Sequence, residues 1–247
     1  MTGAERPRGI CFDYGRTLVQ IQRPVTAIAA AGVALAEELS LQQSEWTGTP
    51  AEFAVSLDEL LDQLIGAEQR AHPWHEVEFG TIHRQAMHQL LGKWPSQDVS
   101  ERVAATLQRA WVSGVRVVPE ARASLATLRE RGIRIGLCSN APFPTDLMYE
   151  QLDRLAIRQY FDAVLFSSEI GWRKPDPRVF AELLARLTLP ASSVWFVGDE
   201  WEADIQGARA AGMRAILAPG AGVPGEEAEG LGQWSDLALL IDRAVAP

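Results

Sequence analysis

The sequence predicts an α/β protein in which a parallel sheet is interrupted after its first strand by a helical insertion. From about Val117 onward, short apolar runs alternate with helical segments, and repeated strand–helix units form parallel sheets with helices on both faces. Between Pro24 and Trp111, apolar residues recur only at three- and four-residue spacing, which is the spacing of one face of a helix. A single apolar run, Ile10–Phe12, precedes this helical stretch.

These patterns predict two domains, an α/β core of residues 1–19 and 116–247 and a helical domain of residues 20–115. Helices of the insertion are expected at 24–39, 50–71, 74–91 and 99–112, with breaks at proline and glycine. The core is expected to continue with strands at 133–138, 163–166, 194–197 and 214–217, and with helices at 119–131, 145–155, 176–187, 201–211 and 236–245. A surface loop is expected at 219–232, which is rich in glycine and glutamate.

Composition excludes several classes of protein. A chain of 247 residues that is 47% hydrophobic can bury a sizeable core. The net charge is −9 and the basic residues are scattered, so we expect no nucleic-acid surface, and an anionic ligand would depend on local cations.

No apolar run approaches a membrane span, and the first residues lack a signal-peptide core. Both cysteines, Cys11 and Cys138, lie in apolar runs. We therefore expect buried thiols, a reducing compartment and a cytoplasmic protein without membrane contact.

Two aspartates directly follow strand-like runs. Asp13 comes after the first strand, and Asp199 comes after Gly198 at the end of another. The carboxyl ends of parallel strands meet at one edge of a sheet, where a carboxylate can act as a nucleophile. Two neighbouring carboxylates stay ionised only with a cation between them, and Mg²⁺ prefers a few carboxylates plus other oxygens. Asp204 has two open interpretations, a further ligand or an acid favoured by a helix N-terminus.

The remaining polar candidates also follow strands or turns. Ser139 and Asn140 come directly after an apolar run, where they can also be ordinary turn residues. Lys174 precedes Pro175, and the residue before a proline is held extended. The chain contains only two lysines, Lys93 and Lys174. A lysine inside the sequence Arg-Lys-Pro-Asp-Pro therefore indicates function, and a buried ammonium there would balance Asp13 and a transferring phosphoryl group.

Four segments together resemble the signature motifs of the haloacid dehalogenase-like hydrolases, a superfamily composed largely of magnesium-dependent phosphatases. The segments are Asp13–Thr17, Leu137–Asn140, Arg173–Pro177, and Val197–Asp199 with Asp204. The resemblance implies a Rossmann-like core with an inserted α-helical cap of the C1 type. It also implies a small phosphorylated or otherwise anionic metabolite as substrate, whereas the sequence leaves the oligomeric state open.

The resemblance also implies roles for individual residues. Asp13 would be the nucleophile that forms an aspartyl phosphate, with Ser139 and Lys174 assisting at the phosphoryl group. The implied substrate-binding residues are Arg16, Thr17, Ser139, Asn140 and Lys174. The implied Mg²⁺ ligands are Asp13, the carbonyl of Gly15, Asp199 and Asp204.

Gly15 departs from the family pattern, which has a second aspartate at this position to protonate the leaving group. The loss of general acid–base help costs a factor of roughly 10² to 10⁴ in rate. Three consequences stay open: the leaving group needs no proton, a cap residue supplies it, or activity is vestigial. Arg16 replaces the usual glycine and brings a permanent positive charge that can meet an anionic substrate.

Other functions in the same fold stay open as alternatives. A dehalogenase would use Arg16 as a halide acceptor, and a phosphonate-cleaving enzyme would need a cap lysine, for which Lys93 is the candidate. A weakly catalytic or non-catalytic binding protein would keep the metal and anion site. All four histidines lie in the insertion, where most are expected on helix surfaces and one of them, or a nearby glutamate, could supply the missing proton. They are His72, His75, His83 and His88, and the glutamates are Glu76 and Glu78.

Overall fold

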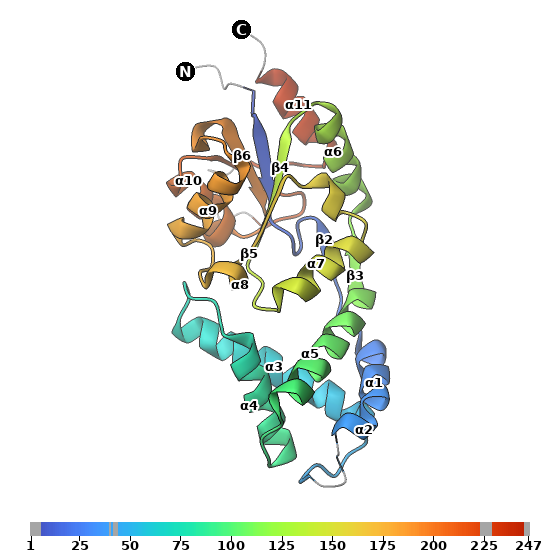
Figure 1. Cartoon of the computed structure of the whole chain (residues 1–247). Coiled ribbons are helices and arrows are strands. Elements are labelled where there is room, and N and C mark those ends of the chain that lie inside the picture. Colours follow the sequence, from blue (N-terminus) through green and yellow to red (C-terminus); the bar gives the residue numbers. More distant parts are fainter. Residues whose placement is uncertain (1–5, 40, 42–43, 223–228, 245–247) are drawn as a thin grey trace. The chain divides into compact units, whose positions relative to one another are not determined.

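The computed structural model describes residues 6–39, 41, 44–222 and 229–244, and it divides into two compact units (Figure 1). The core unit comprises Met1–Gln20, Arg116–Ala141 and Leu155–Pro247, and the helical unit comprises Ile21–Val115 and Pro142–Arg154. Part of the expected loop, residues 223–228, and the last residue of the expected C-terminal helix, Val245, lie outside the described residues. None of the described helices has the length and apolar character needed to span a bilayer.

A five-stranded parallel sheet forms the centre of the core unit. Its strands are β1 (Gly9–Phe12), β4 (Arg134–Ser139), β5 (Ala163–Phe166), β6 (Val194–Gly198) and β7 (Arg214–Leu217), in the order β5-β4-β1-β6-β7. The central strand β1 pairs with β4 on one side and β6 on the other, so that Phe12 lies level with both Leu137 and Val197. The predicted α/β fold with a parallel sheet is confirmed.

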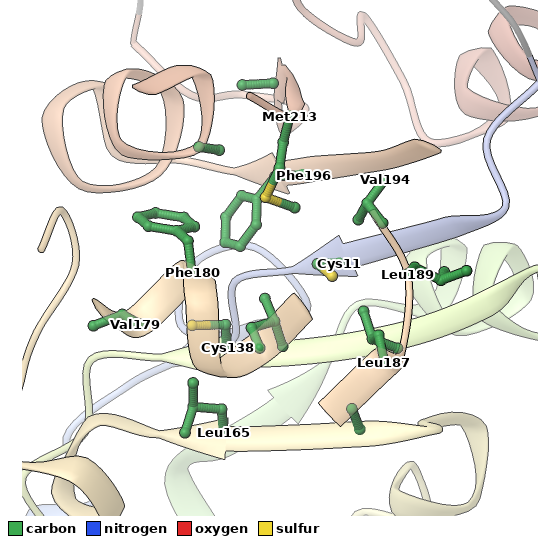
Figure 2. Packing of buried hydrophobic residues seen from close by; sticks show 14 of the residues in the cluster. Cys11, Cys138, Leu165, Val179, Phe180, Leu187, Leu189, Val194, Phe196 and Met213 are labelled. Carbon is green, nitrogen blue, oxygen red and sulfur yellow. The ribbon is translucent and has the colours of Figure 1, made fainter. Parts of the chain in front are cut away.

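Both faces of this sheet are covered by helices. On one face Cys11, Cys138 and Phe196 pack against α9 (Pro177–Leu187), where Phe180 meets Phe196 with ring centroids 5.6 Å apart (Figure 2). Successive strand residues point to opposite faces, and Phe12 accordingly contacts Trp234 on the other face, where the helices are α6 (Pro119–Glu130) and α11 (Ser235–Arg243). All four residues of β1 are buried.

The two cysteines are small apolar core residues, as predicted. Cys11 and Cys138 are free thiols with at most 1% of their surface exposed. Burial raises the pKa of the Cys138 thiol to about 12 and that of Cys11 well above its ordinary value. Both thiols therefore stay protonated at neutral pH and contribute packing rather than reactivity.

In the part of the helical unit that the structure describes, five helices contribute to one apolar cluster. They are α1 (Val25–Ala34), α2 (Ala36–Leu39), α3 (Pro50–Ala71), α4 (Phe79–Leu91) and α5 (Gln97–Trp111), and a further helix, α7 (Thr145–Arg154), contacts α5. The predicted helix at 50–71 is confirmed, and it begins where the Thr49 side chain accepts a hydrogen bond from Glu52 N while the Glu52 carboxylate accepts one from Thr49 N. This reciprocal cap satisfies two backbone donors that a helix start leaves unpaired.

Several expected boundaries in this unit were wrong. The helix expected at 24–39 is interrupted at Leu35, and the helix expected from Trp74 begins only at Phe79. The Glu78 carboxylate accepts a hydrogen bond from Thr81 N at 2.7 Å, which fixes this later start. Sequence analysis also missed a two-stranded sheet of β2 (Val19–Ile21) and β3 (Val115–Val117), because three-residue strands leave too short a pattern to recognise.

One histidine of the helical unit is buried, whereas most were expected on helix surfaces. His83 on α4 is 1% exposed, and its Nδ1 lies 2.7 Å from the Ser100 hydroxyl on α5. His72 and His75, by contrast, are exposed. Burial lowers the pKa of His83 to about 4, so this ring is neutral at pH 7.

We expect His83 to make the protein less stable as pH falls from about 6.5 to 4. In that range the unfolded chain protonates His83 and the folded chain does not, so the free energy of unfolding decreases by up to about 1.4 kcal/mol per pH unit. His83→Gln lacks this contribution, and its stability deficit relative to wild type should narrow as pH falls in urea titrations. His75→Gln is the exposed control, and a deficit independent of pH would contradict the assignment.

Candidate active site

The candidate site lies at the carboxyl edge of the sheet, where three strands end side by side. Asp13 follows β1, Ser139 ends β4, and Asp199 follows β6. β1 is the middle strand: β4 and β5 follow on one side of it, and β6 and β7 on the other. In parallel sheets of this kind, ligands bind in the crevice where the strand order reverses. The backbone N–H of Asp13 donates to Val197 O at 2.9 Å, so the pairing of β1 with β6 extends to Asp13.

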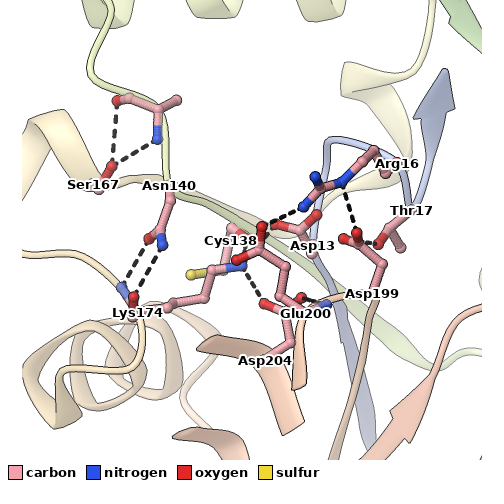
Figure 3. Close-up of polar contacts among 11 residues, drawn as sticks. Asp13, Arg16, Thr17, Cys138, Asn140, Ser167, Lys174, Asp199, Glu200 and Asp204 are labelled. Atoms are coloured by element: carbon pink, nitrogen blue, oxygen red, sulfur yellow. Dashed lines mark hydrogen bonds and ion pairs between the residues drawn. The ribbon is translucent and has the colours of Figure 1, made fainter. Parts of the chain in front are cut away.

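The Lys174 ammonium is the centre of the site's polar contacts (Figure 3). Its Nζ donates to Asp13 Oδ1 at 2.7 Å, to Asp204 Oδ1 at 2.6 Å and to the Cys138 carbonyl at 3.0 Å. The side chain is 1% exposed. An ammonium has three donors, so each one has an acceptor, and two carboxylates share a single buried cation.

The electrostatics of this cluster keep the lysine charged. Burial alone would lower the pKa of Lys174, but the carboxylates of Asp13 and Asp204 raise it above its ordinary value. Burial raises the pKa of Asp13 to about 7, and Lys174 opposes that rise. The ammonium is therefore the group that makes an ionised Asp13 tolerable inside the protein.

Asp204 is held behind Lys174 by a close approach to the end of β6. It lies in the π-helical segment η5 (Trp201–Gln206), and its Oδ2 accepts a hydrogen bond from Glu200 N at 3.0 Å. A Cβ placed on Gly198 would lie 2.3 Å from Asp204 Oδ2, so any larger residue at 198 would displace this carboxylate. Sequence analysis did not predict that position 198 must be a glycine to leave room for Asp204. The available signal was the glycine directly before Asp199.

Asp199 is engaged by two residues of the loop after β1. Its Oδ2 accepts from Arg16 Nε at 2.8 Å, and its Oδ1 lies 3.4 Å from the Thr17 hydroxyl (Figure 3). The Arg16 guanidinium also pairs with Glu200, a partner that sequence analysis did not identify. Burial raises the pKa of Asp199, and Arg16 opposes the rise.

Three carboxylates form a group suited to a cation. One oxygen each from Asp13, Asp199 and Asp204 lie within 4.8 Å of one another. With Glu200, the site has four carboxylates against the two cations Arg16 and Lys174, an excess of two negative charges that a divalent cation would balance. Hard oxygen donors of this kind suit Mg²⁺, so the donor set fits the predicted ion.

The side chains of Ser139, the last residue of β4, and of Asn140, which follows it, are engaged differently. The Ser139 side chain makes no hydrogen bond to any described residue, although it is only 6% exposed. Asn140, predicted to bind substrate, uses its amide on the Lys174 backbone, donating to Lys174 O at 3.0 Å and accepting from Lys174 N at 2.8 Å. Ser167 accepts from Ala141 N at 2.7 Å and secures the same loop. Asn140 is therefore placed to position Lys174.

Gly15 and Arg16 differ in backbone conformation. Gly15 lies outside the left-handed region, whereas Arg16 lies in it with φ 60°. The backbone at position 15 therefore does not have the positive φ that favours glycine. Arg16 has the conformation in which glycine is usually found.

Comparison with known proteins identifies the family. Residues 7–212 match the haloacid dehalogenase-like hydrolases. The chain belongs to this family. The resemblance predicted from the four motifs is thereby confirmed, and the chain is a hydrolase by family.

Relatives of the family cover different shares of this chain. Haloacid dehalogenase-like hydrolase domain-containing protein 3 of Bos taurus is 30% identical over 86% of this chain and 82% of its own length. A ribulose-1,5-bisphosphate 5-phosphatase of Halopiger xanaduensis is 39% identical, and this match spans less than half of that relative, 44% of each chain. The structure of a 2-haloacid dehalogenase from Pseudomonas syringae pv. Tomato DC3000 has a TM-score of 0.66 at 23% identity, covering 95% of this chain and 97% of that one. At this identity the structural likeness concerns the fold alone.

We expect Lys174→Met to lower the free energy of unfolding at pH 7 by about 3–5 kcal/mol, because removing one partner of a buried ion pair leaves uncompensated charge. The deficit should shrink as pH falls through about 7, since protonation of Asp13 removes part of that charge. Lys93→Met, which replaces the only other lysine, is the matched control in denaturant titrations. A deficit below 1 kcal/mol would mean that the ammonium does not hold the cluster together.

Proposed function

We propose that this protein is a Mg²⁺-dependent phosphatase of a small phosphorylated metabolite, acting through an aspartyl phosphate on Asp13. The observation that carries the proposal is the buried contact of Lys174 with Asp13 beside the acidic group that includes Asp199. Relatives support phosphorylated metabolites as substrates: a glyceraldehyde 3-phosphate phosphatase of Pyrococcus abyssi is 30% identical over 84% of this chain and 79% of its own length.

In the first step, Asp13 attacks phosphorus through its free oxygen. Oδ1 accepts the hydrogen bond from Lys174, whereas Oδ2 receives none from the described residues. A new bond forms between Oδ2 and phosphorus, and the ester P–O bond breaks with its electron pair leaving on the alcohol oxygen. Water then attacks phosphorus and the Oδ2–P bond breaks with its electron pair returning to Asp13, which releases inorganic phosphate. The alcohol oxygen takes up a proton from solvent, and the attacking water gives one up to solvent, so the two steps balance.

Charge stabilisation comes from fixed groups around Asp13. Lys174 is already hydrogen-bonded in the resting protein, so it needs no reorganisation when charge moves from the carboxylate to the phosphoryl group. The free Ser139 hydroxyl at the end of β4 is available to donate to a phosphoryl oxygen. A Mg²⁺ ion held by Asp13 and Asp199, with the Gly15 carbonyl, would add Lewis-acid stabilisation of the same charge. Asp204 assists by holding Lys174.

Three alternatives in the same fold receive less support. A dehalogenase would use Arg16 to accept a halide, but the guanidinium lies against the carboxylates of Asp199 and Glu200, whose negative charge would repel a halide. A binding protein without turnover would not need the buried Lys174 ammonium on Oδ1 of Asp13, which leaves Oδ2 free to attack. A phosphonate-cleaving enzyme would use Lys93, which lies in the loop between α4 and α5 in the helical unit. The buried lysine that contacts Asp13 is Lys174 instead.

The proposal predicts hydrolysis of 4-nitrophenyl phosphate that requires Mg²⁺ and is abolished in Asp13→Asn. The substitution is nearly isosteric but removes the nucleophile, so turnover should fall by at least about 10³-fold while the circular dichroism spectrum is retained. A screen of phosphorylated metabolites, run with Mg²⁺ and with excess chelator, then names the substrate. Full turnover in chelator, or in Asp13→Asn, contradicts the proposal.

Gly15 predicts a strong dependence on the leaving group. Without a donor at this position, negative charge must remain on the departing oxygen, so aryl and acyl phosphates should react roughly 10² to 10⁴ times faster than alkyl phosphates. Gly15→Asp should increase alkyl-phosphate turnover, since position 15 lies outside the left-handed region.

Gly15→Ala is the control that adds a side chain without a proton donor. Plots of log kcat/KM against leaving-group pKa should be steep for the wild type and for Gly15→Ala, and flatter for Gly15→Asp. A flat plot for the wild type would mean that another residue protonates the leaving group.

A further inference from the structure

Arg16 places a long cation where the backbone favours glycine. Its φ is 60°, and the only other described non-glycine residues with positive φ are Ala156 and Thr188. An L-residue pays an energetic cost in this conformation. The side chain is 65% exposed, so packing does not explain why an arginine is held there. Its contacts are electrostatic and are directed at the acidic group.

The guanidinium occupies an oxygen that a metal ion would use. Arg16 Nε donates to Asp199 Oδ2 at 2.8 Å, and the same side chain pairs with Glu200. Thr17 Oγ1 lies 3.4 Å from the other Asp199 oxygen. The Thr17 hydroxyl can stay in place when a metal ion binds, but the Arg16 guanidinium sets a positive charge against Asp199 Oδ2. A divalent cation on Asp199 would be repelled by this charge unless the guanidinium moved away.

We propose that Arg16 is a displaceable counter-cation that competes with the divalent metal ion for Asp199 and so lowers the metal affinity of the site. This inference rests on the metal site of the proposed function. In the metal-free protein the guanidinium neutralises Asp199. When the metal ion binds, Arg16 leaves Asp199 Oδ2 and keeps its second partner, Glu200.

The two cations of the site differ in the way that this role requires. Lys174 is 1% exposed and has three acceptors, so it is a permanent partner of Asp13 and Asp204. Arg16 is largely exposed, and Glu200, its second partner, is 52% exposed. Water can solvate a guanidinium that moves out along this surface, so displacement costs little. Arg16 is the exchangeable cation of the pair.

Mg²⁺ titration by isothermal calorimetry tests the inference without any need for turnover. We expect Arg16→Asn and Arg16→Gly to bind Mg²⁺ more tightly than wild type, on the order of fivefold at low salt, because an exposed ion pair has been removed from a ligand. The gain should shrink at high ionic strength. Asparagine tolerates the left-handed conformation, so Arg16→Asn removes the charge with little change in backbone strain.

Arg129→Asn is the matched control, because Arg129 is an exposed arginine paired with Asp162 elsewhere in the core unit. It changes the net charge equally and should leave the Mg²⁺ affinity unchanged. Asp199→Ala should remove most binding.

The outcomes separate this inference from the proposed function. Equal or weaker affinity in both Arg16 variants, with binding still lost in Asp199→Ala, overturns the role of Arg16 and leaves the metal site standing. A gain in Arg16→Gly alone assigns the effect to the backbone and also overturns it. If no variant binds Mg²⁺, or if Asp199→Ala binds as wild type does, the metal site fails and the inference fails with it.

Discussion

The candidate site depends on one buried ammonium shared by two carboxylates. Lys174 Nζ contacts Asp13 and Asp204 at 2.7 and 2.6 Å, and without this ammonium burial would favour the protonated form of Asp13. Two neighbouring features support the contact. Asn140 hydrogen-bonds the Lys174 backbone, and Gly198 leaves space for Asp204. The ammonium joins Asp13 after β1, the Cys138 carbonyl of β4 and Asp204 in η5, which are far apart in the sequence, so the fold and the proposed chemistry rest on the same contact.

The loop after β1 carries two residues on which the proposed chemistry depends. Position 15 is a glycine without a side chain, and its φ lies outside the left-handed region. Arg16, with φ 60°, places a guanidinium against Asp199. Both residues bear on charge at the sheet edge, because the loop follows directly on Asp13, whose backbone N–H still donates to Val197 on β6.

Sequence predicted the order of the core elements and the residues at the strand ends, because burial on both faces produces continuous apolar runs. The strands Ala163–Phe166 and Arg214–Leu217 were predicted with the bounds found. Side-chain partners were not predictable, because they depend on contacts between segments distant in the chain. The hydrogen bonds between the Asn140 amide and the Lys174 backbone could not be predicted from the sequence. Most of the four histidines were expected on helix surfaces, and nothing in the sequence singled out His83 as the one buried against Ser100. The requirement for Gly198 likewise appears only when Asp204 is in place.

The central claim is that hydrolysis proceeds through a covalent phosphoryl group on Asp13. The most direct measurement is the stereochemical course at phosphorus, followed with a chiral, isotope-labelled phosphorothioate ester in labelled water. Each in-line displacement inverts the configuration, so attack by Asp13 followed by attack by water predicts net retention. Net inversion would mean that water attacks the substrate directly, and it would contradict the account.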